Sequence, residues 1–165
     1  GKTEKEKMEF LERSREELEK SKHLNPYFIN TRMLLAAVYR DLGREKEYFD
    51  EYKFSYDFSF GRINKMLTLH PISLNIQKDD LIKNVKIWAS TGKVLLAKGD
   101  QHIDYRNDLI TLQINTRDNI KRIQDTQWDK VPEEKIKAAV ETIMQLRVTA
   151  NQLLAEQPKI RPSTN

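Results

Sequence analysis

Cysteine is absent from this chain of 165 residues, which excludes disulfide bonds, thiol chemistry and zinc sites built from thiolates. That absence is compatible with the cytoplasm and with the bacterial periplasm. Glycine and proline are scarce, with five residues of each. No apolar run approaches the roughly 18 residues of a membrane-spanning helix. We therefore expect long helices with few interruptions and no transmembrane segment.

Motifs for catalysis and for cofactor binding are also lacking. The histidines stand apart at positions 23, 70 and 102, and none belongs to an HExxH sequence. There is no phosphate-binding loop, dinucleotide-binding glycine motif or nucleophile elbow. Asp100, His102 and Asp104 are candidate metal ligands, but their spacing prevents all three from sharing one helical face. We expect a non-enzymatic protein with no cofactor and no metal site.

The positive charge of the chain is concentrated in one segment. Residues 61–98 hold seven Lys or Arg against two Asp or Glu, whereas the segments on either side are nearly balanced. The candidate basic patch in the 62–98 segment consists of Arg62, Lys65, Lys83, Lys86 and Lys93. Such a patch can bind nucleic acid or an anionic membrane. The structural alternative is a solvated helix face.

Periodic apolar residues predict two helices in the first third of the chain. The first covers residues 4–23 and ends before Pro26, because the residue that precedes a proline leaves the helical region. The second covers residues 27–42 and ends at Gly43, which can adopt a positive φ. This second helix is apolar nearly all round, so we expect neighbouring helices to bury it. A third helix is expected to begin near Arg44.

Five residues around the second helix form a spaced pattern, namely Pro26, Leu35, Ala36, Tyr39 and Gly43. The pattern resembles a tetratricopeptide (TPR) repeat and extends over about residues 4–60. It departs from the family at Tyr48 and Phe60, where the family carries a small residue and a proline. The resemblance implies helical hairpins that bind other proteins. It also implies a concave partner-binding face formed by Asn30, Met33, Ala37 and Arg40.

Residues 48–60 contain seven of the chain's 14 aromatic residues. Aromatic and polar residues alternate over 52–60, which is typical of a strand. We favour a helix because the repeat phase requires one. The alternative is an α+β fold, in which residues 52–60 pair with an extended segment at 72–77. If the aromatic surface is exposed, Tyr52 and Tyr56 are candidate partner contacts; the other interpretation is that these rings form core.

The sequence thus predicts an all-α fold, with TPR-like helical hairpins followed by an antiparallel three-helix bundle. The expected segments are a TPR-like region at 1–60, a connector at 61–78, the bundle at 79–156 and a flexible tail at 157–165. The predicted function is protein–protein interaction, as an adaptor, scaffold or assembly subunit. Partners are other proteins or a second copy of the chain, which the apolar seam at 136–153 would join.

Overall fold

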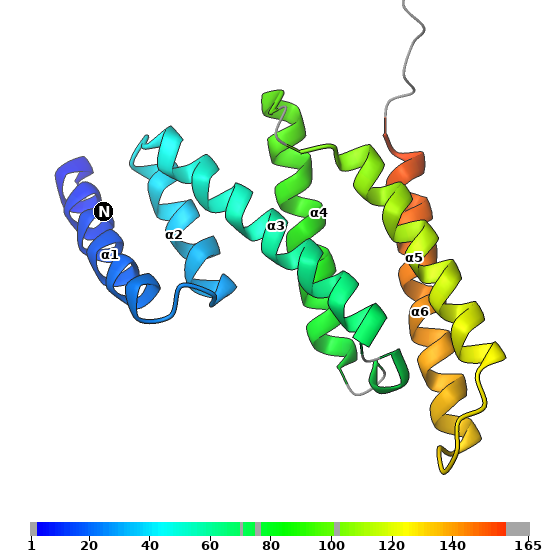
Figure 1. The fold of residues 1–165 in the computed structure, drawn as a ribbon. Helices are drawn as coiled ribbons and strands as arrows, with labels where there is room; N and C mark the ends of the chain where they lie inside the picture. Colours follow the sequence, from blue (N-terminus) through cyan, green and yellow to red (C-terminus); the bar gives the residue numbers. More distant parts are fainter. Residues whose placement is uncertain (1–2, 70, 75–76, 101–102, 158–165) are drawn as a thin grey trace, which may run out of the picture.

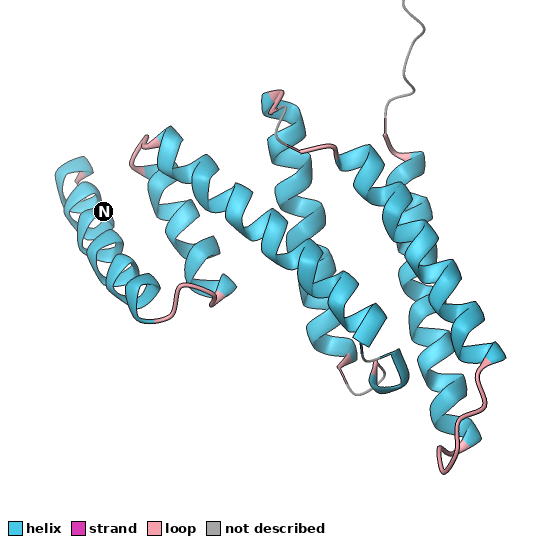
Figure 2. Ribbon diagram, in the orientation of Figure 1, coloured by secondary structure: helices cyan, strands magenta, loops and turns pink. Residues whose placement is uncertain are grey.

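The computed structural model describes residues 3–69, 71–74, 77–100 and 103–157, and no β-strand occurs among them (Figure 2). The helices are α1 (Glu4–Leu24), α2 (Ile29–Asp41), α3 (Glu45–Leu69), the short 3₁₀ helix η1 (Pro71–Ser73), α4 (Lys78–Lys98), α5 (Tyr105–Asp125) and α6 (Glu133–Ala155). The predicted all-α fold is confirmed. No helix in the described part of the chain is long and apolar enough to cross a membrane.

The helix ends follow local signals in the sequence. Helix α1 ends just before Pro26, as predicted. Gly43 follows α2 with a φ of 75°, and the N–H of Arg44 donates to the carbonyl oxygen of Tyr39 at 2.8 Å. Gly99 ends α4 with a φ of 79°. Both glycines adopt the left-handed conformation that other residues avoid, and the predicted end of the second helix at Gly43 is confirmed.

Helix α3 is the central element of the fold. The first four helices pack in succession, α1 on α2, α2 on α3 and α3 on α4 (Figure 1). Helices α5 and α6 form a second pair, which joins the rest through contacts of α5 with α3 and of α6 with η1. Helices α2 and α4 both pack on α3 but hardly touch each other.

The aromatic block lies within α3, so the strand alternative for residues 52–60 is wrong. Helices pack on α3 from more than one side. The aromatic residues of 52–60 and the polar residues between them are therefore both partly covered. Ser55 and Ser59 are buried among the aromatic rings, and the Ser59 hydroxyl donates to the Ser55 carbonyl oxygen at 2.6 Å. The proposed pairing segment, 72–77, includes the end of η1, and its residues 75–76 lie outside the described residues.

Residues 61–69 differ from the predicted connector at 61–78, because they continue α3 without a break. Ile63, Met66 and Leu67 are all buried, and their spacing continues a helical apolar face. That face packs into the core of the following helices, and burial keeps the segment helical. The helical bundle therefore includes the second half of α3 as well as the three predicted helices.

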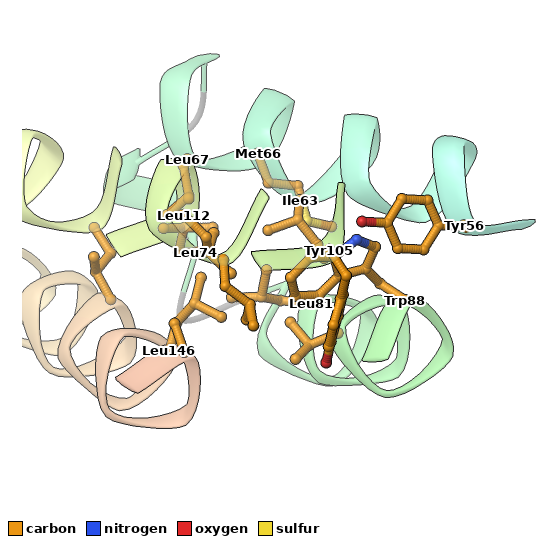
Figure 3. Packing of buried hydrophobic residues seen from close by; sticks show 14 of the residues in the cluster. Tyr56, Ile63, Met66, Leu67, Leu74, Leu81, Trp88, Tyr105, Leu112 and Leu146 are labelled. Carbon is orange, nitrogen blue, oxygen red and sulfur yellow. The ribbon is translucent and has the colours of Figure 1, made fainter. Parts of the chain in front are cut away.

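One apolar core joins α3, α4, α5 and α6, and Figure 3 shows its packing. Its aromatic centre consists of Tyr56, Trp88 and Tyr105, with ring centroids 5.3 to 6.5 Å apart. Helix α4 packs chiefly on α3, whereas the prediction placed it in a bundle with α5 and α6 alone. Ile143 is fully buried within this core, so the seam at 136–153 faces inward.

Candidate functional site

Helices α2 and α4 form the walls of a groove, because both rest on α3 with little direct contact between them. The larger part of the groove has a volume of about 680 Å³ and is lined by Asn30, Met33, Leu34, Asp79, Ile82, Lys83, Lys86 and Ile87. A second part of about 270 Å³ is lined by Tyr27, Phe28, Ile29, Phe58, Arg62, Asp80, Lys83, Asn84 and Ile87. The two parts share Lys83 and Ile87 and are therefore adjacent. We call them together the α2–α4 groove.

Large apolar side chains are unusually exposed along the α2–α4 groove. Tyr27 is 65% exposed, Phe28 49%, Leu34 59% and Ile82 40%. Twelve large apolar side chains are exposed in the described part of the chain, and these four all line this one groove. Single exposed apolar residues are common on protein surfaces, whereas four in one hollow make the α2–α4 groove the candidate binding surface.

A stack of aromatic rings lies at the end of the groove near the start of α2. Tyr27 stacks on Phe58 with centroids 6.0 Å apart, and Phe58 stacks on Phe54 at 5.9 Å. The guanidinium of Arg32 lies 3.7 Å from the centroid of the Phe54 ring, in a cation–π contact. Because α3 carries two of these rings, the exposed Tyr27 is positioned by a long helix rather than by its loop alone.

The α4 wall of the groove carries two lysines that form no ion pair within the described part of the chain. Lys83 and Lys86 are exposed, and neither forms an ion pair with another residue in the described part of the chain. Arg62, by contrast, donates to Asp80 at 2.8 Å across α3 and α4. Asp79, in the first turn of α4, is the other acidic residue that lines the groove. The groove therefore combines apolar side chains with a net positive charge.

The structure brings together four of the residues that the sequence singled out. Asn30 and Met33 came from the repeat resemblance, Lys83 and Lys86 came from the basic patch, and all four line the larger part of the groove. Arg62 lines the adjoining part. The remaining candidates on α2, α3 and α4 lie outside the lining of the groove, namely Ala37, Arg40, Lys65 and Lys93.

The two tyrosines that were candidate partner contacts lie mostly inside the protein. Tyr56 is only 2% exposed, and its hydroxyl donates a hydrogen bond to Asp108. Burial raises the pKa of Tyr56 well above its usual range. Tyr52 is half-buried against Tyr48, with centroids 4.7 Å apart, and burial raises its pKa to about 12. A partner cannot reach Tyr56 without disrupting the core, so this residue is removed from the candidate surface.

Sequence reasoning missed the apolar residues that dominate the groove. The prediction that neighbours bury α2 on all sides is wrong for Leu34, because none of the described helices covers that side. Ile82 and Ile87 lie off the main apolar face of α4, which packs on α3 through residues such as Trp88. Apolar residues outside the face that packs on the core were the signal that could have identified this surface.

No protein-family model, curated protein or solved structure matches this chain significantly. In the described residues, no three His, Asp or Glu side chains lie close enough together to hold a metal ion. Of the candidate metal ligands, His102 lies outside the described residues. The α2–α4 groove is the candidate functional site of the described chain.

Proposed function

We propose that this chain is a non-enzymatic protein-interaction module, acting as an adaptor, scaffold or assembly subunit, and that the α2–α4 groove is its binding surface. The observation that carries this proposal is the presence of four exposed large apolar side chains in one groove. Aromatic, methionine and arginine side chains are enriched at the centres of protein interfaces. All three kinds line this groove.

The TPR resemblance supports the same surface. It assigns α2 to the first helix of a repeat and α3 to the second, and in such repeats the first helices line the concave face. Asn30 and Met33, which the resemblance places on that face, both line the groove. Helix α4, which lies beyond the residues that resemble the repeat, provides the opposite wall.

The decisive experiment compares the full chain with two variants in affinity capture from cell extract at about 0.3 M salt, where weak electrostatic contacts are largely screened. Leu34→Gln changes an exposed apolar side chain in the groove, and Met144→Gln makes the same kind of change on the exposed face of α6. Loss of one buried leucine contact weakens binding by about 1.5–3 kcal/mol, or roughly tenfold to a hundredfold.

We expect a protein that wild type and Met144→Gln capture and that Leu34→Gln does not. Equal capture of every partner by all three chains would exclude the groove as the binding surface. Capture of no protein by any chain would count against an adaptor role.

The alternative function is electrostatic binding of nucleic acid or anionic membrane through the 62–98 segment. The unpaired Lys83 and Lys86 favour it, but Arg62 pairs with Asp80, and Lys93 lies 3.6 Å from Glu156. This function requires retention that falls steeply as salt rises. It is distinguished by a Lys83→Glu/Lys86→Glu variant that loses nucleic acid or lipid while Leu34→Gln retains it.

A further inference from the structure

The charges of the α2–α4 groove indicate what its occupant must supply. Arg62 and Asp80 satisfy each other, since both Nε and Nη2 of the arginine donate to one carboxylate oxygen at 3.2 and 2.8 Å. Lys83 and Lys86 have no such partner among the described residues. They lie three positions apart on α4 and so point to the same side of the helix. An occupant with carboxylates beside this edge is therefore favoured over a neutral or basic one.

The apolar contacts of the groove define the spacing of the occupant's own apolar residues. Phe28, the residue that precedes α2, and Leu34 are six positions apart, which corresponds to about 9 Å at the rise of a helix. On the facing wall, Ile82 and Ile87 are five positions apart, or about 7.5 Å. A helix that presents apolar residues at positions i, i+3 or i+4, and i+7 covers about 10.5 Å. That span is long enough to reach both contacts on either wall.

We infer that the α2–α4 groove binds an acidic amphipathic helix of a partner protein. The apolar face of that helix lies between α2 and α4, over the rings of α3, and its carboxylates pair with Lys83 and Lys86. This is the helix-in-groove mode of peptide recognition, with added charge complementarity. The inference rests on the proposed function, because it names the partner chemistry of the same groove.

The test is a selection from a displayed library of random peptides of about 16 residues, long enough for roughly 24 Å of helix. The full chain is the target, and selected peptides are then titrated against four variants. Leu34→Gln removes an apolar contact in the groove, and Met144→Gln is its control. Lys83→Glu/Lys86→Glu reverses the groove charge. Lys65→Glu/Lys137→Glu makes the same change in net charge at exposed positions outside the groove.

We expect selected peptides rich in Asp and Glu, with apolar residues at helical spacing and helical circular dichroism when bound. Their affinity should fall at least tenfold with Lys83→Glu/Lys86→Glu and with Leu34→Gln, and should stay within about twofold of wild type with both controls. Peptides in which Lys replaces Asp and Glu should bind the charge-reversed variant. An unfolded variant would not bind them, so this result separates loss of charge complementarity from unfolding.

Three results would overturn the acidic partner and leave the groove intact. The first is a set of neutral or basic peptides that depend on Leu34 but not on Lys83 and Lys86. The second is a dimer of the wild-type chain in sedimentation that Leu34→Gln dissociates, since the occupant would then be a second copy. Nucleic acid that competes selected peptides off the groove would likewise replace the inferred occupant. Recovery of no peptide that depends on Leu34 would overturn the proposed function itself.

Discussion

Arg32 of α2 and Glu51 of α3 form an ion pair inside the protein, with Arg32 Nη1 3.1 Å from Glu51 Oε2 and only 9% and 3% of the two residues exposed. Lys22 of α1 donates to the other oxygen of the same carboxylate. Arg32 Nε donates to the carbonyl oxygen of Pro26 at 2.9 Å. A single buried carboxylate thus connects α1, α2 and α3, and it fixes α2 as a wall of the α2–α4 groove.

Replacing Glu51 with Gln should strongly destabilise the protein, because the charge of the buried Arg32 would lose its partner. Breaking a buried ion pair on one side costs about 3–5 kcal/mol. Urea unfolding of the full chain would measure this cost. Glu45→Gln, at an exposed position on the same helix, should cost less than about 1 kcal/mol. A loss for Glu51→Gln as small as that of Glu45→Gln would show that the buried pair contributes little.

Gly92→Ala should destabilise the protein, although alanine is the better helix former. A Cβ at this position would lie 2.8 Å from two ring carbons of Tyr105 and 3.0 Å from the ring of Tyr56. Both rings are buried and cannot move freely. Overpacking of this kind costs about 1–3 kcal/mol, which the helix preference of about 1 kcal/mol offsets only in part.

Gly61→Ala is the matched control, because it lies within α3 and a Cβ there would meet nothing within 4 Å. This change should stabilise the protein by about 0.5–1 kcal/mol. Thermal unfolding of both variants would show shifts of opposite sign. Equal stabilisation by the two alanines would mean that the aromatic centre accommodates a methyl group beside Gly92.

Asp108 should make the stability of the protein fall as pH rises through the acidic range. Burial raises the pKa of this carboxyl, with smaller contributions in the same direction from Asp104 and Asp57, and it outweighs the hydrogen bond from Tyr56. The folded state therefore binds this proton more tightly than the unfolded state. The resulting stability is complete below the unfolded pKa of about 3.9 and is lost as pH rises through the folded pKa.

Asp108→Asn removes this titration, so the comparison isolates it from every other carboxyl. Urea unfolding of wild type and variant from about pH 3 to pH 7 gives the difference in free energy at each pH. Wild type should lose stability relative to Asp108→Asn as the pH rises. A difference that stays constant across this range would contradict a raised pKa at Asp108.

Truncation of the neighbouring leucines of α2 should change stability by very different amounts. Leu35 is fully buried, so Leu35→Ala should cost about 2–5 kcal/mol of stability. Leu34 lies exposed in the groove, so Leu34→Ala should change stability by less than about 0.5 kcal/mol. Denaturant unfolding would measure both. A large loss for Leu34→Ala would indicate that this side chain serves folding rather than binding.

The sequence predicted the positions of the helices more accurately than it predicted which helices pack together. Gly43 ended α2 as expected, because a glycine with positive φ terminates a helix through local hydrogen bonds. The alternation of aromatic and polar residues over 52–60 did not distinguish a strand from a helix. The same residues lie on different faces at the two periods. The segment is helical in the structure, where α2, α4 and α5 all pack on α3. It also placed Tyr56 in the core and not on a partner surface.

By itself, the sequence determined the helix ends near Pro26 and Gly43 and the concentration of positive charge in the 62–98 segment, since each depends on residues close together in the chain. Only the tertiary structure decided which faces stay uncovered. Leu34 and Ile82 line one groove because α2 and α4 both pack on α3 while hardly touching each other. That arrangement depends on contacts between residues far apart in sequence, such as Arg32 with Glu51 and Tyr56 with Asp108, which local periodicity does not record.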